Sequence, residues 1–161
     1  MNLLAYRPPR IAMAFLGVAA LLHWLTPLGH VHIVSSRWLA LVTGSTGFLI
    51  MMQGWWLFRR DGVAICPTAP TASLITDGIY RLTRNPMYLG ILLMLVGSAC
   101  WFGTLPFVAA AVGWWGIIQF AFCPHEEQKL QATFGDDYRQ YRARVRRWIW
   151  FPRPAYPGSR R

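Results

Sequence analysis

Residues 85–124 read NPMYLGILLMLVGSACWFGTLPFVAAAVGWWGIIQFAFCP, which is 40 consecutive positions without Asp, Glu, Lys, Arg or His. One transmembrane helix uses about 17 to 25 residues, so the stretch is long enough for two. Near its middle, Gly103 and Pro106 supply the residue types that make tight turns. The stretch therefore predicts a helical hairpin that crosses the membrane twice, with spans over 86–103 and 105–123.

The composition of the whole chain agrees with a membrane protein. Of 161 residues, 55% are hydrophobic and 14% are charged, whereas about 25% are charged in soluble domains. The net charge of +10 also occurs in nucleic-acid-binding proteins, but here the basic residues flank apolar runs, which favours an anionic lipid surface as their partner. We expect one all-α integral membrane domain over residues 1–161, with no nucleic-acid partner.

Two further apolar runs precede the hairpin. Residues 11–28 are apolar apart from His23, and residues 38–58 are uncharged, so each run can span a bilayer. An ionisable residue inside a span is a functional candidate by default, but for His23 we favour a neutral imidazole bonded to a neighbouring helix. The second run contains three expected contact points for a neighbouring helix: Gly44, Gly47 and Gly54.

The distribution of charge predicts the orientation of these four spans. An even number of spans places both termini on one side of the membrane. If that side is the cytoplasm, it holds fifteen of the sixteen Lys and Arg residues, with Arg37 outside, as the positive-inside rule requires. We therefore expect a bacterial inner-membrane protein with both termini and all six acidic residues on the cytoplasmic side.

The polar residues after the hairpin predict helices over 125–149 on the cytoplasmic face. Gly135 is a plausible C-cap and Asp136 a plausible N-cap, so a break is expected there. The basic residues that follow suit the C-terminal end of a helix dipole: Arg142, Arg144, Arg146 and Arg147. An apolar stripe with helical spacing accompanies them, typical of an amphipathic helix on anionic lipid: Leu130, Phe134, Tyr138, Tyr141, Val145 and Trp148.

The cysteine and histidine residues indicate no metal site. The three cysteines, Cys66, Cys100 and Cys123, include no CxxC pair and are interpreted as small buried residues. His30 and His32 form a His-x-His pair in a loop, but the sequence offers them no third ligand.

Two polar clusters lie at the ends of the predicted hairpin. Residues 77–88 lead into its first helix, and Glu126 and Glu127 follow its second. Because the chain crosses and returns, we expect Asn85 and Tyr88 to lie near Glu126. A carboxylate close to an arginine at a lipid boundary is also consistent with a purely structural ion pair, and the residues alone favour neither interpretation.

Both clusters carry motifs of a known family. Residues 78–90 read GIYRLTRNPMYLG and residues 126–147 read EEQKLQATFGDDYRQYRARVRR. Together with the apolar hairpin between them, they resemble the isoprenylcysteine carboxyl methyltransferase and phospholipid methyltransferase superfamily. The resemblance runs from about Leu74 to Arg147, nearly half of the chain, and residues 1–60 share with that family only their two spans.

The resemblance implies S-adenosylmethionine as the methyl donor, bound at the cytoplasmic mouth of the helices, and a lipophilic acceptor. It implies the following cofactor-binding residues: Ala72, Ser73, Leu74, Ile75, Gly78, Tyr80, Asn85, Pro86, Met87, Tyr88 and Glu126. Candidates for a role in the reaction itself are Arg84, Asn85 and Glu127. Methyl transfer is a direct displacement, which needs alignment and exclusion of water and does not need a metal.

Two positions depart from the relatives that methylate prenylated cysteine. Those relatives have a histidine at the position of Asn85 and an arginine at that of Phe122. The acceptor therefore stays open between a carboxylate, a thiol and an amine. Two other functions remain as alternatives: a membrane reductase that uses NADPH, and a non-catalytic membrane homologue.

Overall fold

The computed structural model describes residues 8–25, 36–61 and 73–148, and all of the elements in these ranges are helices. In chain order they are α1 (Pro8–Leu25), α2 (Arg37–Arg60), the 3-10 helix η2 (Gly78–Arg81), α3 (Pro86–Phe102), α4 (Leu105–Ile117), the π-helical segment η3 (Ile118–Phe122) and α5 (Cys123–Arg144). The predicted all-α class is confirmed. The end of the first predicted span (26–28), Cys66, His30 and His32 lie outside the described residues.

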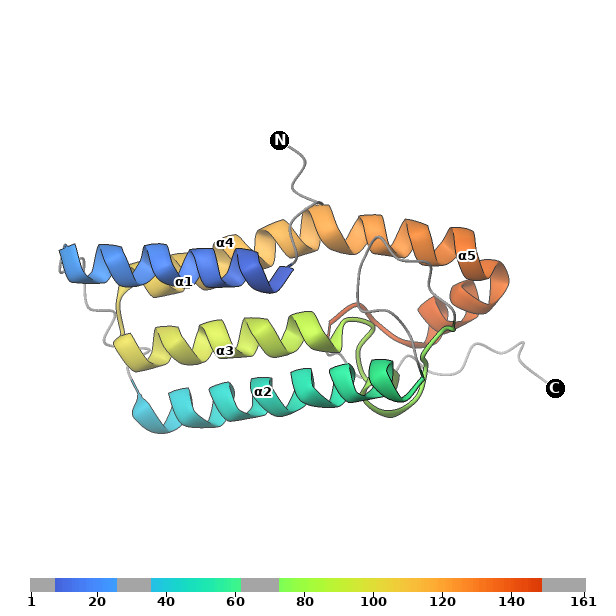
Figure 1. Ribbon diagram of the computed structural model, residues 1–161, viewed down its shortest axis with the longest axis horizontal. Helices are drawn as coiled ribbons and strands as arrows, with labels where there is room; N and C mark the ends of the chain where they lie inside the picture. Colours follow the sequence, from blue (N-terminus) through green and yellow to red (C-terminus); the bar gives the residue numbers. More distant parts are fainter. Residues whose placement is uncertain (1–7, 26–35, 62–72, 149–161) are drawn as a thin grey trace.

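The long helices lie nearly parallel, with α3 between α2 and the pair formed by α1 and α4 (Figure 1). The most extensive contact joins α2 to α3. There Gly47 and Gly90 face each other so closely that a Cβ added to either would lie 2.5 Å from the carbonyl oxygen of the other. Gly97 lies similarly close to Gly44. The predicted close packing at the α2 glycines is confirmed, and α3 is the partner.

The turn between α3 and α4 forms as the sequence predicts. Gly103 ends α3 in the left-handed conformation, with φ of 61°, and its N–H donates to the carbonyl of Ala99 at 2.8 Å. Pro106 lies in the first turn of α4, where no backbone donor is needed. His23 of α1 reaches this turn, with 3.3 Å between its Nδ1 and Thr104 Oγ1. The interpretation of His23 as bonded to a neighbouring element is confirmed.

The second arm of the hairpin does not end near Pro124. Instead α4, η3 and α5 form one continuous helix, whereas the sequence predicted separate helices over 105–123 and from 125 onward. A proline inside an α-helix lacks the N–H and crowds the preceding turn. In the wider turn of η3, the Cys123 N–H donates to the carbonyl of Ile118, five residues back. The helix therefore passes the proline through a π-helical turn.

The break predicted at Gly135 is confirmed. Gly135 has φ of 52° and ψ of −118°, and the second half of α5 folds back toward the helix bundle (Figure 1). This reversal brings Tyr138, Tyr141 and Val145 against Leu57 and Tyr80, where all five are buried. The apolar stripe of the C-terminal region thus packs against the protein, and not against lipid as the sequence indicated.

The outer surface of the bundle supports a membrane protein. Within the described residues, two continuous helices are long and apolar enough to cross a bilayer, namely α1 and the helix over residues 105–144, and α3 is apolar but shorter, at 17 residues. Large apolar side chains point outward, with exposed fractions of 81% for Trp24, 80% for Trp38 and 74% for Phe120. Such a surface is suited to lipid and is unfavourable in water.

Candidate functional site

The segment before α3 is fixed to the end of α2. Gly78 begins η2 with φ of 55°, and a Cβ added there would lie 3.0 Å from Leu57 Cδ1, so the position suits glycine alone. The adjacent Asp77 forms an ion pair with Arg60 at 2.9 Å. These contacts set the course of the chain from α2 into η2 and so place Tyr80 under the second half of α5.

The chain after α5 returns to the start of α3. Thr83 Oγ1 donates to the carbonyl of Arg147 at 2.8 Å, and the backbone N–H of Arg84 donates to the carbonyl of Arg146 at 2.9 Å. The side-chain amide of Asn85 also donates to the carbonyl of Arg147, at 3.3 Å. Asn85, predicted to lie near Glu126, therefore bonds to the returning segment and has a structural partner there.

Tyr88 and Glu126 form the contact that the hairpin predicted. Tyr88 lies in the first turn of α3, and its hydroxyl donates to Glu126 Oε1 at 2.5 Å. Its ring packs edge-on against Trp114 of α4, which is completely buried. The helices that make up the hairpin thus hold a phenol and a carboxylate together where the apolar part of the bundle ends.

Tyr80 approaches the same carboxylate from η2. It is buried, its ring lies 5.9 Å from that of Phe58, and its carbonyl accepts a hydrogen bond from the Tyr141 hydroxyl at 2.8 Å. Burial, with smaller contributions from Tyr141 and Glu126, raises the pKa of the Tyr80 phenol. Both tyrosines of the first motif, residues 78–90, therefore lie in the electrostatic field of Glu126.

Glu126 lies just beyond the apolar part of the continuous helix. Burial raises the pKa of its carboxyl group, and the hydrogen bond from Tyr88 and the charge of Lys129 only partly oppose this. A carboxyl group of this kind favours its neutral form more than an exposed one does. It is also ready to accept from a cationic or hydroxyl-bearing ligand, since a carboxylate has more acceptor sites than the one bond to Tyr88 uses.

Glu127, the next residue, belongs to a different cluster. Its Oε1 lies 2.7 Å from Arg147 Nε and 3.2 Å from Arg84 Nη2, and its Oε2 lies 4.0 Å from Arg142 Nη2. Burial opposes its ionisation, but the hydrogen bond from Arg147 and the charges of all three arginines outweigh this and lower the pKa of the carboxyl group. Arg84 also donates to the Tyr138 hydroxyl at 3.1 Å.

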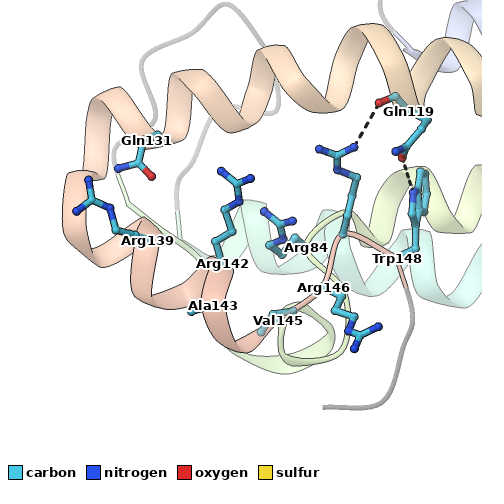
Figure 2. A pocket seen from close by; sticks show the side chains of 10 residues that line it. Arg84, Gln119, Gln131, Arg139, Arg142, Ala143, Val145, Arg146 and Trp148 are labelled. Atoms are coloured by element: carbon cyan, nitrogen blue, oxygen red, sulfur yellow. Dashed lines mark hydrogen bonds between the residues drawn. The ribbon is translucent and has the colours of Figure 1, made fainter. Parts of the chain in front are cut away.

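These arginines line a cavity of about 740 Å³ between the two halves of α5 (Figure 2). Arg84 and Arg142 extend into this space beside each other, and Gln131 and Arg139 lie where the chain reverses. On the opposite side Trp148 Nε1 donates to Gln119 Oε1 at 2.7 Å. We call this space the arginine cavity; its lining includes five arginines: Arg84, Arg139, Arg142, Arg146 and Arg147.

The remaining predicted cofactor-binding residues have varied surroundings. Ser73 is half-buried, and its hydroxyl oxygen is buried without a hydrogen-bond partner among the residues that the structure describes. Leu74 and Ile75 pack in the apolar cluster around Tyr80. Pro86 and Met87 lie against Gly54 of α2, within 3.4 Å and 3.1 Å of a Cβ added there, which gives both a packing role. Ala72 lies outside the described residues.

Sequence reasoning missed the residues that surround Glu127. Arg142 and Arg147 were interpreted through the helix dipole and the lipid surface, and Tyr138 as part of an amphipathic stripe. A signal was present, because Tyr138 and Arg142 are four residues apart and share a helix face. That face turns toward Glu127 only because the chain reverses at Gly135, and neither spacing nor composition gives the direction of such a reversal.

Comparison with known proteins identifies relatives of this arrangement. Residues 35–137, more than half of the chain, match the phospholipid methyltransferase family. An uncharacterized protein of Haemophilus influenzae is 36% identical over 69 residues, which are 39% of this chain and 100% of that protein. No solved structure matches.

Two relatives with named activities match part of the chain. The protein-S-isoprenylcysteine O-methyltransferase of Schizosaccharomyces pombe is 34% identical over 76 residues, which are 45% of this chain and 30% of that protein. Protein-S-isoprenylcysteine O-methyltransferase B of Arabidopsis thaliana is 34% identical over 73 residues, 45% of this chain and 36% of that protein. The match thus spans about a third of the length of these two relatives.

Proposed function

Because the chain belongs to the phospholipid methyltransferase family, we propose that it is an integral membrane enzyme that transfers a methyl group from S-adenosylmethionine to a lipophilic acceptor. The observation that carries the proposal is the Tyr88–Glu126 pair at the end of the apolar helices, with Tyr80 beside it. These three residues come from the two motifs for which the family resemblance predicts donor binding.

The residues present fit the chemistry of S-adenosylmethionine. The buried hydroxyl of Ser73, which has no partner among the described residues, supplies a polar group in the predicted binding segment. Glu126 offers acceptor sites for the ammonium group or the ribose hydroxyls. The faces of Tyr80 and Tyr88 suit the sulfonium cation, since aromatic rings attract cations.

The donor supplies an activated methyl group, and the protein has to hold that group in line with the acceptor. In the displacement, the acceptor atom forms the new bond to carbon while the sulfur departs with the electron pair as a neutral thioether. Tyr88, held by Glu126 and Trp114, is a positioning residue for the donor. Burial of Tyr88 helps to exclude water, which would otherwise compete for the methyl group.

The two acidic residues differ in their suitability to take a proton from the acceptor. Three arginines lower the pKa of Glu127, which makes it a weak base. Glu126 has a raised pKa and is the better proton acceptor of the two. We therefore propose Glu126 as the proton acceptor, and Arg84, Asn85 and Glu127 as residues whose part in the reaction is to be tested by substitution.

The proposed membrane arrangement has four spans, α1, α2, α3 and the helix from Leu105 to Phe122, in a single domain over residues 1–161. Both termini are cytoplasmic, which keeps the basic residues on the inner side of a bacterial inner membrane. The exposed Trp24, Trp38 and Phe120 side chains support lipid contact along the bundle. The donor then enters from the cytoplasm and the acceptor from the bilayer.

The experiment that tests this function follows a labelled methyl group. Detergent-solubilised protein is incubated with methyl-labelled S-adenosylmethionine and a total lipid extract, followed by small thiols and amines, and the products are analysed by mass spectrometry. We expect the label in a lipophilic product, whose identity gives the acceptor. If no product carries the label, the chain is a non-catalytic homologue, and binding of NADPH in place of the donor would indicate a reductase.

A further inference from the structure

The arginine cavity carries more positive charge than its neighbours neutralise. Four of its arginines share only two carboxylates among the described residues. Arg84, Arg142 and Arg147 all pair with Glu127, and Arg139 pairs with Asp136 at 3.0 Å. At least two positive charges therefore remain in excess around the space between the halves of α5.

Two of the guanidinium groups that face this space, those of Arg84 and Arg147, are held in fixed positions. Arg84 is nine-tenths buried and is held by Glu127 and Tyr138, while its Nε is buried without a hydrogen-bond partner among the described residues. Arg147 is held by Glu127 and by the carbonyl of Gln119, to which it donates at 3.4 Å. Arginines fixed in this way lose little conformational entropy when they bind an anion.

The carbonyl of Gln119 is available to Arg147 because of the π-helical turn. In that turn Cys123 donates to Ile118, so the next residue, Pro124, would donate to Gln119 if it had an N–H. The missing N–H of Pro124 leaves the Gln119 carbonyl free to accept from the guanidinium of Arg147. The irregular helix and the cavity are thus connected features of the fold.

We propose that the arginine cavity is a binding site for a phosphate-type oxyanion, carried either by a membrane lipid or by a soluble phosphate compound. Several guanidinium forks around one space match the oxygens of a phosphate, which several donors can bind at once. A volume of about 740 Å³ holds more than the anion itself, and Trp148 and Val145 provide an apolar wall for the group attached to it.

This site is separate from the Tyr88–Glu126 pair. Glu126 and Glu127 are adjacent in α5, but one bonds to Tyr88 of α3 and the other to the arginines of the returning segment. The oxyanion therefore binds on the other side of α5 from the proposed donor site. The inference does not depend on methyl transfer, and the two sites are tested by different ligands.

The test compares variants of the full-length protein in an uncharged detergent and in lipid nanodiscs. In Arg139→Gln/Arg142→Gln, two cavity arginines are neutralised without changing Arg84, Arg147 or Glu127. Arg144→Gln is the matched control, because Arg144 lies on the same helix but is exposed, bonds to Gln140 and does not line the cavity. The probes are pyrophosphate, measured by calorimetry, and phosphatidic acid in phosphatidylcholine nanodiscs, measured by native mass spectrometry.

We expect the unmodified protein to bind at least one probe, and the double variant to bind it at least tenfold more weakly, which corresponds to about 1.4 kcal/mol. Arg144→Gln should change the affinity by less than twofold. Binding of pyrophosphate in detergent supports a soluble source, and binding of phosphatidic acid alone supports a lipid.

Three results would overturn the inference. They are no binding of either probe, an equal loss in Arg144→Gln, and a matching loss of S-adenosylhomocysteine affinity in the double variant. The last would assign the arginines to the donor site. If the double variant keeps its affinity for S-adenosylhomocysteine but loses its affinity for the probe, the oxyanion site is distinct from the proposed donor site.

Discussion

Glu126 and Glu127 are neighbours in sequence, yet their environments are opposite. Glu126 is half-buried beside the phenol of Tyr88, and loss of water around it raises the pKa of its carboxyl group. Glu127 is buried among three arginines, which lower the pKa of its carboxyl group. Consecutive residues of a helix point about 100° apart, so one pair of carboxylates can serve two sides of α5. A shared motif therefore does not imply a shared role.

The largest effect is expected from Glu127→Ala. This change leaves three arginines without their common counterion, and breaking a buried ion pair in this way costs about 3 kcal/mol. The free energy of unfolding of the solubilised protein, from denaturant titration, measures the loss. Glu126→Ala should cost less, because it removes a carboxylate that is itself unfavourable to bury. A larger loss in Glu126→Ala would invert the comparison.

The next effect is expected from Tyr88→Phe, which leaves the Glu126 carboxylate buried without its donor and should destabilise the fold by about 2 kcal/mol. Tyr138→Phe, which removes the bond from Arg84 but no charge, should cost about 1 kcal/mol.

In calorimetric titrations with S-adenosylhomocysteine, Tyr88→Ala should weaken binding more than Tyr88→Phe does. Equal losses would show that the ring is not a contact.

The pH dependence of stability should differ in sign between the two carboxylates. A lowered pKa means that Glu127 stabilises the fold above its unfolded-state value, near 4.5, and that this contribution is lost as pH falls. A raised pKa means that Glu126 destabilises the fold when the pH is above its unfolded-state pKa, because ionisation is less favourable in the folded protein. Relative to the unmodified protein, Glu127→Gln should therefore be less stable at pH 7 and Glu126→Gln more stable. The Glu126 difference should disappear as pH falls to about 4.5, whereas the Glu127 difference should shrink only as pH falls further below that value.

The smallest effect is expected from Asp136→Asn. Asp136 and Arg139 are 80% and 74% exposed, so their ion pair is screened by water and should contribute less than about 0.5 kcal/mol. Thermal unfolding compared with that of Glu127→Gln provides the measurement. A loss as large as that of Glu127→Gln would mean that exposed pairs in this region matter as much as buried ones.

The sequence predicted the part of the site that depends on topology alone. A hairpin must bring its two ends together, so the neighbourhood of Tyr88 and Glu126 followed from an apolar run with a turn at its middle. The turn at Gly103 and the packing at Gly47 followed from local rules as well. Each of these predictions needed only spacing and residue type.

The parts that were missed depend on angles that no pattern encodes. Pro124 is typical of a helix boundary, but the π-helical turn before it lets the helix continue. Gly135 was recognised as a break, but the direction of the reversal decides that Arg142 faces Glu127 and that Tyr138 faces the protein. Asn85 was predicted to lie near Glu126 because the hairpin returns there, and the bond from its amide to the returning chain was not predicted.

Calorimetric titration of S-adenosylhomocysteine into the Glu126→Ala variant tests the central claim most directly, with Asp137→Asn, an exposed acidic residue of the same helix, as the matched control. The account predicts that Glu126→Ala loses measurable binding while Asp137→Asn keeps the affinity of the unmodified protein. An unchanged affinity in folded Glu126→Ala would contradict the assignment of this side of α5 to the methyl donor.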